Sequence, residues 1–445
     1  MEFSNLNFLF RFLPIFILVY YLSPARWKNG VLFLGSILFY AFGEPLYVFL
    51  LLVSVGLHYF AAWCIKGMKR HPKKKQRLLA VLIVFDVGML LFFKYTSYRM
   101  PLGFSFFTFT VLSYILDIYM GKCEPERSFA KAGIYMMLFP KLISGPIASY
   151  RQMYPELERR RITFEETEQG LMIFTIGLGF KVIFADHFGM LWNEIQTAGF
   201  DSISTPLAWI GAAGYSAQLF FDFQGYSLMA IGVGRMIGFH LPKNFDHPYR
   251  AKSVAEFYRR WHITLGRWFR DYLYIPLGGN RGTMVRTVCN LLLVWFVTGM
   301  WHGSTGNFIL WGMVLGLLVV LEKCCLKKFL NRHPVVAHLY ILLVIPMTWI
   351  VFAITKIREV GVYFTRLFPF WGSPDYVNQG DFMRSLGRYG IFFVLAFLVS
   401  LPFVDKLYEK YKDHLVTKLL LLVVFWYCVY KVANGMNNPF LYFQF

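Results

Sequence analysis

Two histidines in this sequence each follow a tryptophan, at Trp261-His262 and Trp301-His302, and arginines are concentrated near the first pair. The surrounding chain is mostly apolar. An imidazole beside apolar membrane segments is costly unless it is paired or has a chemical task, and its pKa near neutrality suits it to move protons. The neighbouring arginines add groups that bind phosphate. We therefore take the two histidines as the candidate catalytic residues.

His302 stands where an apolar run stops. Gly303 and Gly306 follow it before apolar residues resume. Glycines placed here predict that the helix breaks at the histidine, which is how a membrane protein lines a buried chamber with side chains and backbone groups. His302 is then available as a general base toward a hydroxyl or a thiol. The alternative is that it only forms a hydrogen bond between packed helices.

Residues 256–272 predict an amphipathic helix. Phe257, Trp261, Leu265 and Trp268 recur at intervals of three or four residues, and arginines occupy the other face. Guanidinium groups bind phosphate bidentately, so the candidates for contacts with a phosphate-bearing acyl donor are Arg259, Arg260, Arg267 and Arg270. The alternative is a helix on the inner membrane surface whose arginines contact only anionic lipid.

The composition places these residues in a membrane protein. Of the 445 residues, 57% are hydrophobic and 16% are charged, against about 25% charged in soluble domains. The net charge of +20 is spread between apolar runs, which argues against a nucleic-acid-binding domain. The six cysteines are scattered, so we predict neither a metal site nor a disulfide framework.

The apolar runs predict an all-α polytopic protein with about ten to twelve crossings of about 20 residues each. We expect a single domain over residues 1–445. The run at 31–65 is too long for one crossing, and Gly43-Glu44-Pro45 divides it. Residues 133–150 contain Pro140 and a Ser144-Gly145-Pro146 turn, which predicts a re-entrant segment.

The basic residues predict the orientation of the chain. Lysines and arginines cluster at 66–77 and 243–286, and such loops usually face the cytoplasm. Counting crossings from these loops places both termini and the loop at 366–388 on the extracytoplasmic side.

Several motifs together resemble the membrane-bound O-acyltransferase family. They are Phe221-Asp222-Phe223-Gln224-Gly225-Tyr226-Ser227, Pro242-Lys243-Asn244-Phe245, Arg259-Arg260-Trp261-His262, Trp268-Phe269-Arg270-Asp271-Tyr272-Leu273-Tyr274-Ile275-Pro276-Leu277-Gly278-Gly279-Asn280-Arg281 and Thr298-Gly299-Met300-Trp301-His302-Gly303. The resemblance is strong over residues 100–321 and is greatest to the bacterial branch that O-acetylates alginate, peptidoglycan and cellulose.

This resemblance implies that His302 is the essential histidine of the family and His262 its second polar site residue. His302 would act as the base or as a transient acyl carrier. In this family a cytoplasmic donor and an extracytoplasmic acceptor meet in a channel, here through a bacterial inner membrane. Further channel or substrate contacts are expected from Asp222, Gln224, Trp261, Asp271, Tyr274, Asn280, Trp301 and Asn307.

We expect acetyl-coenzyme A as the donor substrate, no bound cofactor or metal, and membrane lipid around the chain. The expected acceptor is a polysaccharide, reached through an extracytoplasmic acetyltransferase partner. Two alternatives stay open at this point. One is a D-alanyl transferase for teichoic acid that uses a carrier-protein thioester, and the other is a non-catalytic polysaccharide exporter.

Overall fold

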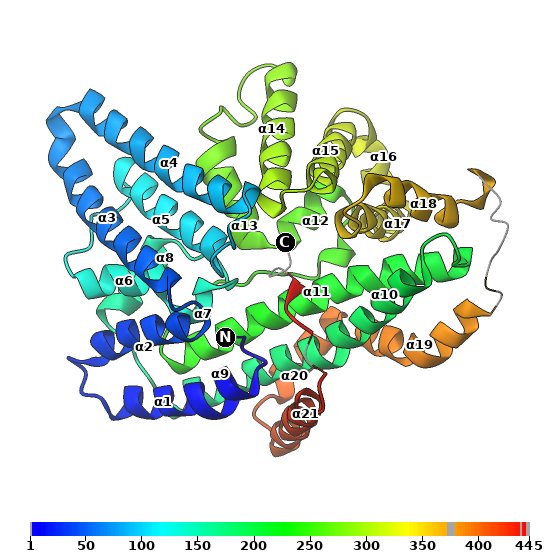
Figure 1. Ribbon diagram of the computed structural model, residues 1–445, viewed down its shortest axis with the longest axis horizontal. Helices are drawn as coiled ribbons and strands as arrows, with labels where there is room; N and C mark the ends of the chain where they lie inside the picture. The colour runs from blue at the N-terminus through cyan, green and yellow to red at the C-terminus, as the bar shows by residue number, and fades with distance from the viewer. Residues whose placement is uncertain (1, 372–377, 379, 437, 442–445) are drawn as a thin grey trace. The chain divides into compact units, whose positions relative to one another are not determined.

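The computed structural model describes residues 2–371, 378, 380–436 and 438–441. Every regular element in these residues is a helix, as Figure 1 shows, which confirms the predicted all-α fold. The chain divides into two compact units, residues 1–177 with 226–243 and residues 178–225 with 244–445. We call these unit 1 and unit 2; the single domain expected from the sequence stays a prediction.

Eight helical segments of the described chain are long and apolar enough to cross a membrane: Tyr47–Arg70, Pro72–Tyr95, Phe164–Ala198, Met284–His302, Gly306–Arg332, Pro334–Ala353, Asp381–Val399 and Leu415–Ala433. Shorter apolar helices occupy Phe8–Leu22, Lys28–Gly43 and Phe104–Tyr119. The protein is therefore a multi-pass membrane protein. Of the predicted external loop at 366–388, residues 372–377 and 379 lie outside the described residues.

Unit 1 holds the N-terminal helices. They are η1 (Phe8–Phe12), α1 (Leu13–Leu22), α2 (Lys28–Gly43), α3 (Tyr47–Gly67), η2 (Met68–Arg70), α4 (Pro72–Tyr95), α5 (Phe104–Tyr119), α6 (Phe129–Met137), α7 (Phe139–Leu142) and α8 (Tyr150–Glu158), with most of α9 (Phe164–Gly179) and the end of α11 (Thr205–Met236). The predicted division at Gly43-Glu44-Pro45 is confirmed, because α2 ends at Gly43 and α3 begins at Tyr47.

The segment predicted to be re-entrant is broken, as expected. Helix α6 ends at Met137, α7 is a single turn, and residues 143–149 are irregular before α8 begins. These irregular residues are mostly buried in protein, which is the condition under which broken backbone is tolerated at membrane depth. Whether the segment enters the membrane from one side stays a prediction.

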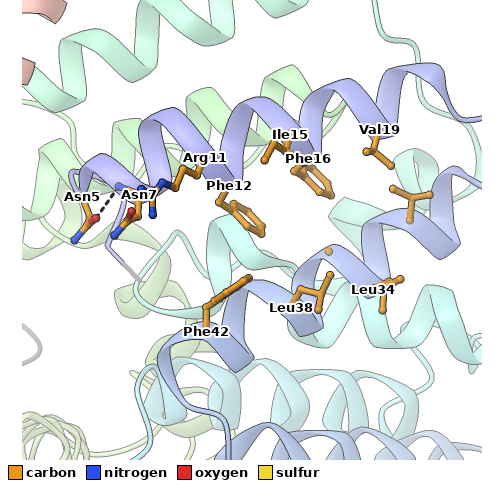
Figure 2. A pocket seen from close by; sticks show the side chains of 12 residues that line it. Asn5, Asn7, Arg11, Phe12, Ile15, Phe16, Val19, Leu34, Leu38 and Phe42 are labelled. Atoms are coloured by element: carbon orange, nitrogen blue, oxygen red, sulfur yellow. Dashed lines mark hydrogen bonds between the residues drawn. The ribbon is translucent and has the colours of Figure 1, made fainter.

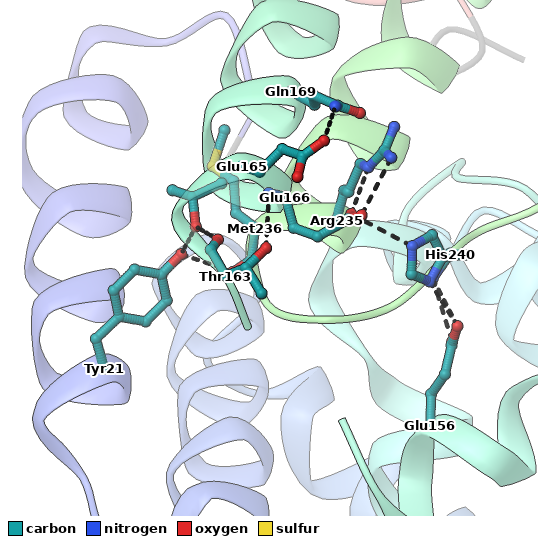
Figure 3. Close-up of polar contacts among 10 residues, drawn as sticks. Tyr21, Glu156, Thr163, Glu165, Glu166, Gln169, Arg235, Met236 and His240 are labelled. Carbon is teal, nitrogen blue, oxygen red and sulfur yellow. Dashed lines mark hydrogen bonds and ion pairs between the residues drawn. The ribbon is translucent and has the colours of Figure 1, made fainter. Parts of the chain in front are cut away.

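Polar contacts tie α8, α9 and the end of α11 together within unit 1. Figure 3 shows Arg235 of α11 paired with Glu166 of α9, with Nε 2.5 Å from Oε2. His240, just beyond α11, lies between Glu156 and Glu166, at 2.8 Å and 3.3 Å from their carboxylate oxygens. These contacts join the three segments where they meet.

Unit 2 holds the remaining elements. They are η3 (Phe180–Ala185), α10 (Asp186–Ala198), the first part of α11, η4 (Pro248–Arg250), α12 (Val254–Arg260), α13 (Ile263–Phe269), η5 (Arg270–Tyr274), α14 (Met284–His302), α15 (Gly306–Leu321), η6 (Glu322–Leu326), α16 (Lys327–Arg332), α17 (Pro334–Ala353), α18 (Ile357–Leu367), η7 (Pro369–Trp371), α19 (Asp381–Val399), α20 (Pro402–Tyr411) and α21 (Leu415–Ala433).

Helices α14 and α15 lie side by side in unit 2 and form a tight pair (Figure 1). A Cβ added at Gly299 would come within 2.6 Å of the Phe308 carbonyl oxygen, and one at Gly312 within 2.5 Å of the Trp295 carbonyl oxygen. Only glycine fits at these two positions. The close approach fixes the short connection between the helices, and His302 is at its start.

Candidate active site

His302 is the last residue of α14, and the predicted break at the histidine is confirmed. Gly303 follows in an extended conformation, and a Cβ on it would come within 2.1 Å of the Phe308 ring. The chain must therefore leave the helix here with a glycine. The imidazole is 7% exposed. Its ring centroid lies 4.9 Å from that of Trp311 and 5.3 Å from that of Phe352, both nearly edge to face.

Asn307 fixes the chain on the other side of the break. Its amide nitrogen donates to the carbonyl oxygens of Val351, at 3.3 Å, and Phe352, at 2.9 Å, at the end of α17. The side chain is fully buried. Asn307 thus holds the start of α15 against the ring that packs on His302, and we interpret it as a positioning residue.

His262 stands at a second break, which the sequence did not predict. Instead of one amphipathic helix over 256–272, the chain forms α12, α13 and η5, and the first two are separated at Trp261 and His262. His262 has φ 46° and ψ 53°. This left-handed conformation is uncommon for residues other than glycine and costs of order 1–3 kcal/mol, and it recurs at functional sites.

Asn244 holds this break. Its backbone oxygen accepts a hydrogen bond from the Ile263 N–H at 2.9 Å. Its side-chain oxygen accepts from the Thr264 N–H at 3.3 Å and from the Thr264 hydroxyl at 2.9 Å. The same oxygen lies 3.2 Å from Nδ1 of His262. An oxygen that only accepts requires the proton on Nδ1, so Nε2 is the basic nitrogen of this imidazole.

Burial keeps His262 neutral. The side chain is 3% exposed, and desolvation lowers the pKa of His262 to about 3. The Phe223 ring packs edge-on against the imidazole, with ring centroids 4.6 Å apart. At physiological pH this histidine can therefore accept a hydrogen bond at Nε2 without carrying a charge.

One cavity in unit 2 brings both histidines together. It has a volume of about 430 Å³ and lies among α12, α13, η5, α14 and α15. The predicted site residues on its wall are Trp261, His262, His302, Tyr274, Arg259, Arg267 and Arg270. Apolar side chains such as Leu291, Val294 and Trp295 complete the wall. The arrangement is an apolar chamber with a few convergent polar groups, which is typical of a ligand site.

The four predicted arginines differ in their contacts. Arg260 is not on the cavity wall; its guanidinium is 2.9 Å from Glu256 and 3.4 Å from Asp246. Arg270 pairs with Asp271 at 2.7 Å. Among the described residues, Arg259 and Arg267 have no carboxylate oxygen within 4 Å that forms an ion pair. These two exposed guanidinium groups are the best placed to meet an anionic ligand.

The remaining predicted contact residues lie away from the cavity wall. Asn280 accepts hydrogen bonds from Tyr274 and Lys323, both at 2.7 Å. Trp301 is buried beside His302, with ring centroids 4.7 Å apart. Gln224 is half-buried in α11. The expected contacts of these residues with substrate stay predictions.

Asp222 belongs to a buried ion cluster. Lys181 lies 2.8 Å from Asp186 and 2.9 Å from Asp222. The Leu441 N–H donates to the other oxygen of Asp222 at 2.8 Å. Asp222 does not line the cavity, and its partners join α11, η3, α10 and the C-terminal segment of unit 2.

Glu322 is a residue beside the candidate site that sequence reasoning missed. It is buried in η6, and its two carboxylate oxygens accept from the N–H groups of Val254 at 2.5 Å and Ala255 at 3.1 Å. A carboxylate at a helix N-terminus satisfies free N–H groups and the helix dipole. Glu322 therefore positions α12, the helix of Arg259. A lone carboxylate after an apolar run gave no sign of this.

Comparison with known proteins identifies the family of the chain. The model of the membrane-bound O-acyltransferase family matches residues 126–364, which include both histidines and the whole cavity. The chain is 31% identical to a probable alginate O-acetylase of Azotobacter vinelandii over 100% of both chains. It is 34% identical to a peptidoglycan O-acetyltransferase of Helicobacter pylori over 79% of this chain and 76% of the relative.

A more distant likeness is to a teichoic acid D-alanyltransferase of Streptococcus thermophilus, 28% identical over 51% of this chain and 58% of the relative. All three relatives are named as enzymes that transfer an acyl group, and this excludes the reading of the chain as a non-catalytic exporter. The chain belongs to the membrane-bound O-acyltransferase family, and it is an O-acyltransferase.

Proposed function

We propose that this protein takes an acetyl group from cytoplasmic acetyl-coenzyme A and passes it toward the hydroxyl groups of a polysaccharide outside the cell membrane. The observation that carries the proposal is the cavity of about 430 Å³ that joins His262 and His302 to the guanidinium groups of Arg259, Arg267 and Arg270. Imidazoles and arginines are the groups that acyl transfer from a phosphate-bearing donor requires.

His302 is the proposed general base. It takes the proton of the attacking hydroxyl as the hydroxyl oxygen bonds to the thioester carbonyl carbon. The carbon–sulfur bond then breaks. The coenzyme sulfur takes the proton from the imidazolium, and the coenzyme leaves as a thiol. The aromatic rings of Trp311 and Phe352 around His302 keep water away from this step.

His262 is proposed to orient the reacting groups. Because its pKa is lowered to about 3, it is neutral at physiological pH and offers Nε2 as a hydrogen-bond acceptor. A hydroxyl or an amide N–H of either substrate is a suitable donor. Arg259 and Arg267 are proposed to bind donor phosphates. Arg270, which also lines the cavity but is paired with Asp271, is proposed as a weaker third contact.

The names of two relatives support a carbohydrate acceptor. One is named for alginate and the other for peptidoglycan. We propose that a second, extracytoplasmic acetyltransferase delivers the group to the glycan, in a bacterial inner membrane with both termini of this chain outside. A carrier-protein thioester is the alternative donor, since the chain also resembles a teichoic acid D-alanyltransferase over half its length.

The test is donor turnover by the purified protein. Wild-type protein in detergent is incubated with acetyl-coenzyme A, the extracytoplasmic acetyltransferase partner and a short oligosaccharide, and free thiol and acetylated sugar are measured. We expect both products to accumulate in equal amounts. The proposal fails if the protein ignores acetyl-coenzyme A and instead consumes the thioester of a carrier protein. A stable radiolabelled acyl-enzyme would indicate that His302 carries the group instead of acting only as a base.

A further inference from the structure

A second cavity lies in unit 1, away from any residue used above. It is a groove of about 700 Å³ between α1, with the η1 turn before it, and α2. Phe12 and Phe16 line one side, and Leu34, Leu38 and Phe42 line the other, as Figure 2 shows. Its volume is in the range of ligand sites in proteins.

The groove is polar at one end only. Asn5, Asn7 and Arg11 line that end, and Figure 2 places their side chains together, beyond Phe12 and Phe42. Asn5 accepts a hydrogen bond from the backbone N–H of Asn7 at 2.8 Å, which fixes the turn before the helix. The rest of the wall is apolar. The groove therefore matches an amphiphilic molecule, with a polar end for the headgroup and an apolar wall for the hydrocarbon part.

Arg11 is the charged group of this end. It is exposed, it lies within the apolar segment Phe8–Leu22, and the ion pairs found among the described residues do not include it. An arginine in an apolar membrane helix is costly to keep without an anionic partner. Within the part of the chain that the structure describes, this guanidinium group therefore has no carboxylate partner, and an anion from the surrounding membrane is a suitable counter-ion.

The apolar part is long enough for part of one acyl chain. From Arg11 to Val19 the helix rises roughly 12 Å at 1.5 Å per residue. The two helices approach closely beside the groove: a Cβ at Gly35 would come within 2.3 Å of the Phe16 ring. A groove of about 700 Å³ between two such helices fits an extended hydrocarbon chain better than a whole helix of another protein.

We propose that this groove is a binding site for one anionic phospholipid. The phosphate accepts hydrogen bonds from the guanidinium of Arg11, with the amide of Asn7 beside it, and one acyl chain lies along Phe12, Leu38 and Leu34. Guanidinium and phosphate pair bidentately, which fixes the headgroup as well as attracting it. The site is independent of the acyl-transfer reaction proposed above.

The test is lipid binding by the full-length protein in detergent, followed by native mass spectrometry. Phosphatidylglycerol is the anionic probe, and phosphatidylcholine of the same chain length is the zwitterionic one. We expect one phosphatidylglycerol to bind, and Arg11→Gln to weaken it about tenfold or more, as expected for the loss of a charge-assisted hydrogen bond. Arg26→Gln is the matched control, because Arg26 is exposed in the turn between α1 and α2 and is not on the groove wall.

A second variant tests the apolar half. Leu38→Trp fills the groove while Arg11 stays in place, and it should also displace the lipid. Equal binding of the two lipids by wild-type protein, or unchanged phosphatidylglycerol binding in Arg11→Gln, would overturn the proposal. So would a cross-link between cysteines placed at Leu34 in two copies of the chain, since a second copy would then cover the groove.

Discussion

His262 and His302 each follow a tryptophan, but their backbone conformations differ. His302 ends a long helix, and aromatic rings surround it. His262 occupies a left-handed conformation between two short helices, and Asn244 fixes its tautomer. One imidazole is therefore set in a chamber where a proton can be accepted, and the other is held neutral and oriented. This difference supports different roles for the two residues.

Replacing His302 should stop acyl transfer without unfolding the protein. Loss of a general base typically costs roughly 10² to 10⁴-fold in rate, so we expect His302→Ala to lower kcat by that amount. The variant should still insert in the membrane and elute as wild-type protein does. His71→Ala is the control, because His71 is exposed in a loop of unit 1. Near wild-type turnover by well-expressed His302→Ala would remove this residue from the mechanism.

The buried His262 should make the protein sensitive to acid. Its folded pKa is lowered to about 3, while the unfolded chain takes up the proton below about 6.5. Protonation therefore favours unfolding, and stability is lost as the pH falls below 6.5. Between pH 6.5 and pH 5 the loss should be about 2 kcal/mol.

The measurement is the Tm of purified protein at pH 7, 6 and 5. The His262→Gln variant should lose less stability over this range than wild-type protein, and His71→Gln should follow wild type. If wild type and His262→Gln lose stability in parallel, the burial of His262 does not control the acid response.

At the scale of helices, one break was predictable and the other was not. Gly303 and Gly306 follow His302 closely in the sequence, so the end of α14 could be predicted from them. The break at His262 is made by Asn244, eighteen residues earlier in the chain. The apolar period runs on through Trp261, and no local signal opposes it. A hydrogen bond from a distant loop therefore overrode the local pattern, and only the fold could reveal it.

The sequence predicted the same role for all four arginines, but the folded helices give them different contacts. We expect Arg259→Gln and Arg267→Gln each to raise the donor KM about tenfold or more, because a charge-assisted hydrogen bond contributes roughly 1.5–3 kcal/mol. Arg260→Gln is the matched control, since Arg260 adjoins Arg259 in α12 but is paired with Glu256 and Asp246 and lies off the cavity wall.

Steady-state kinetics with acetyl-coenzyme A decide this point in equally folded protein. Unchanged donor KM in Arg259→Gln and Arg267→Gln, with lower expression in all three variants, would assign these arginines to the lipid surface. An equal rise in KM for Arg260→Gln would show that the whole basic segment acts through its net charge.

At the scale of the whole molecule, the apolar runs gave the helical, multi-pass character of the chain, because hydropathy and length are local properties. The division at Gly43-Glu44-Pro45 was predicted for the same reason. The ion cluster of Lys181, Asp186 and Asp222 was not, because its members meet only after α10 and α11 pack. Long-range pairing of buried charges is set by the fold and leaves no spacing pattern.

The distribution of lysine and arginine predicts the orientation of the molecule, with both termini outside and the basic loops at 66–77 and 243–286 inside. The test begins with a background that lacks the six native cysteines, most of which are not buried. Single cysteines then replace Lys74, Arg281 and Asn378, all exposed in the structure. An impermeant thiol reagent added to intact cells should label only the cysteine at 378, and all three should react once the membrane is opened. Labelling of the cysteine at 74 or 281 in intact cells would reverse the orientation and place the donor arginines on the wrong side for a cytoplasmic coenzyme.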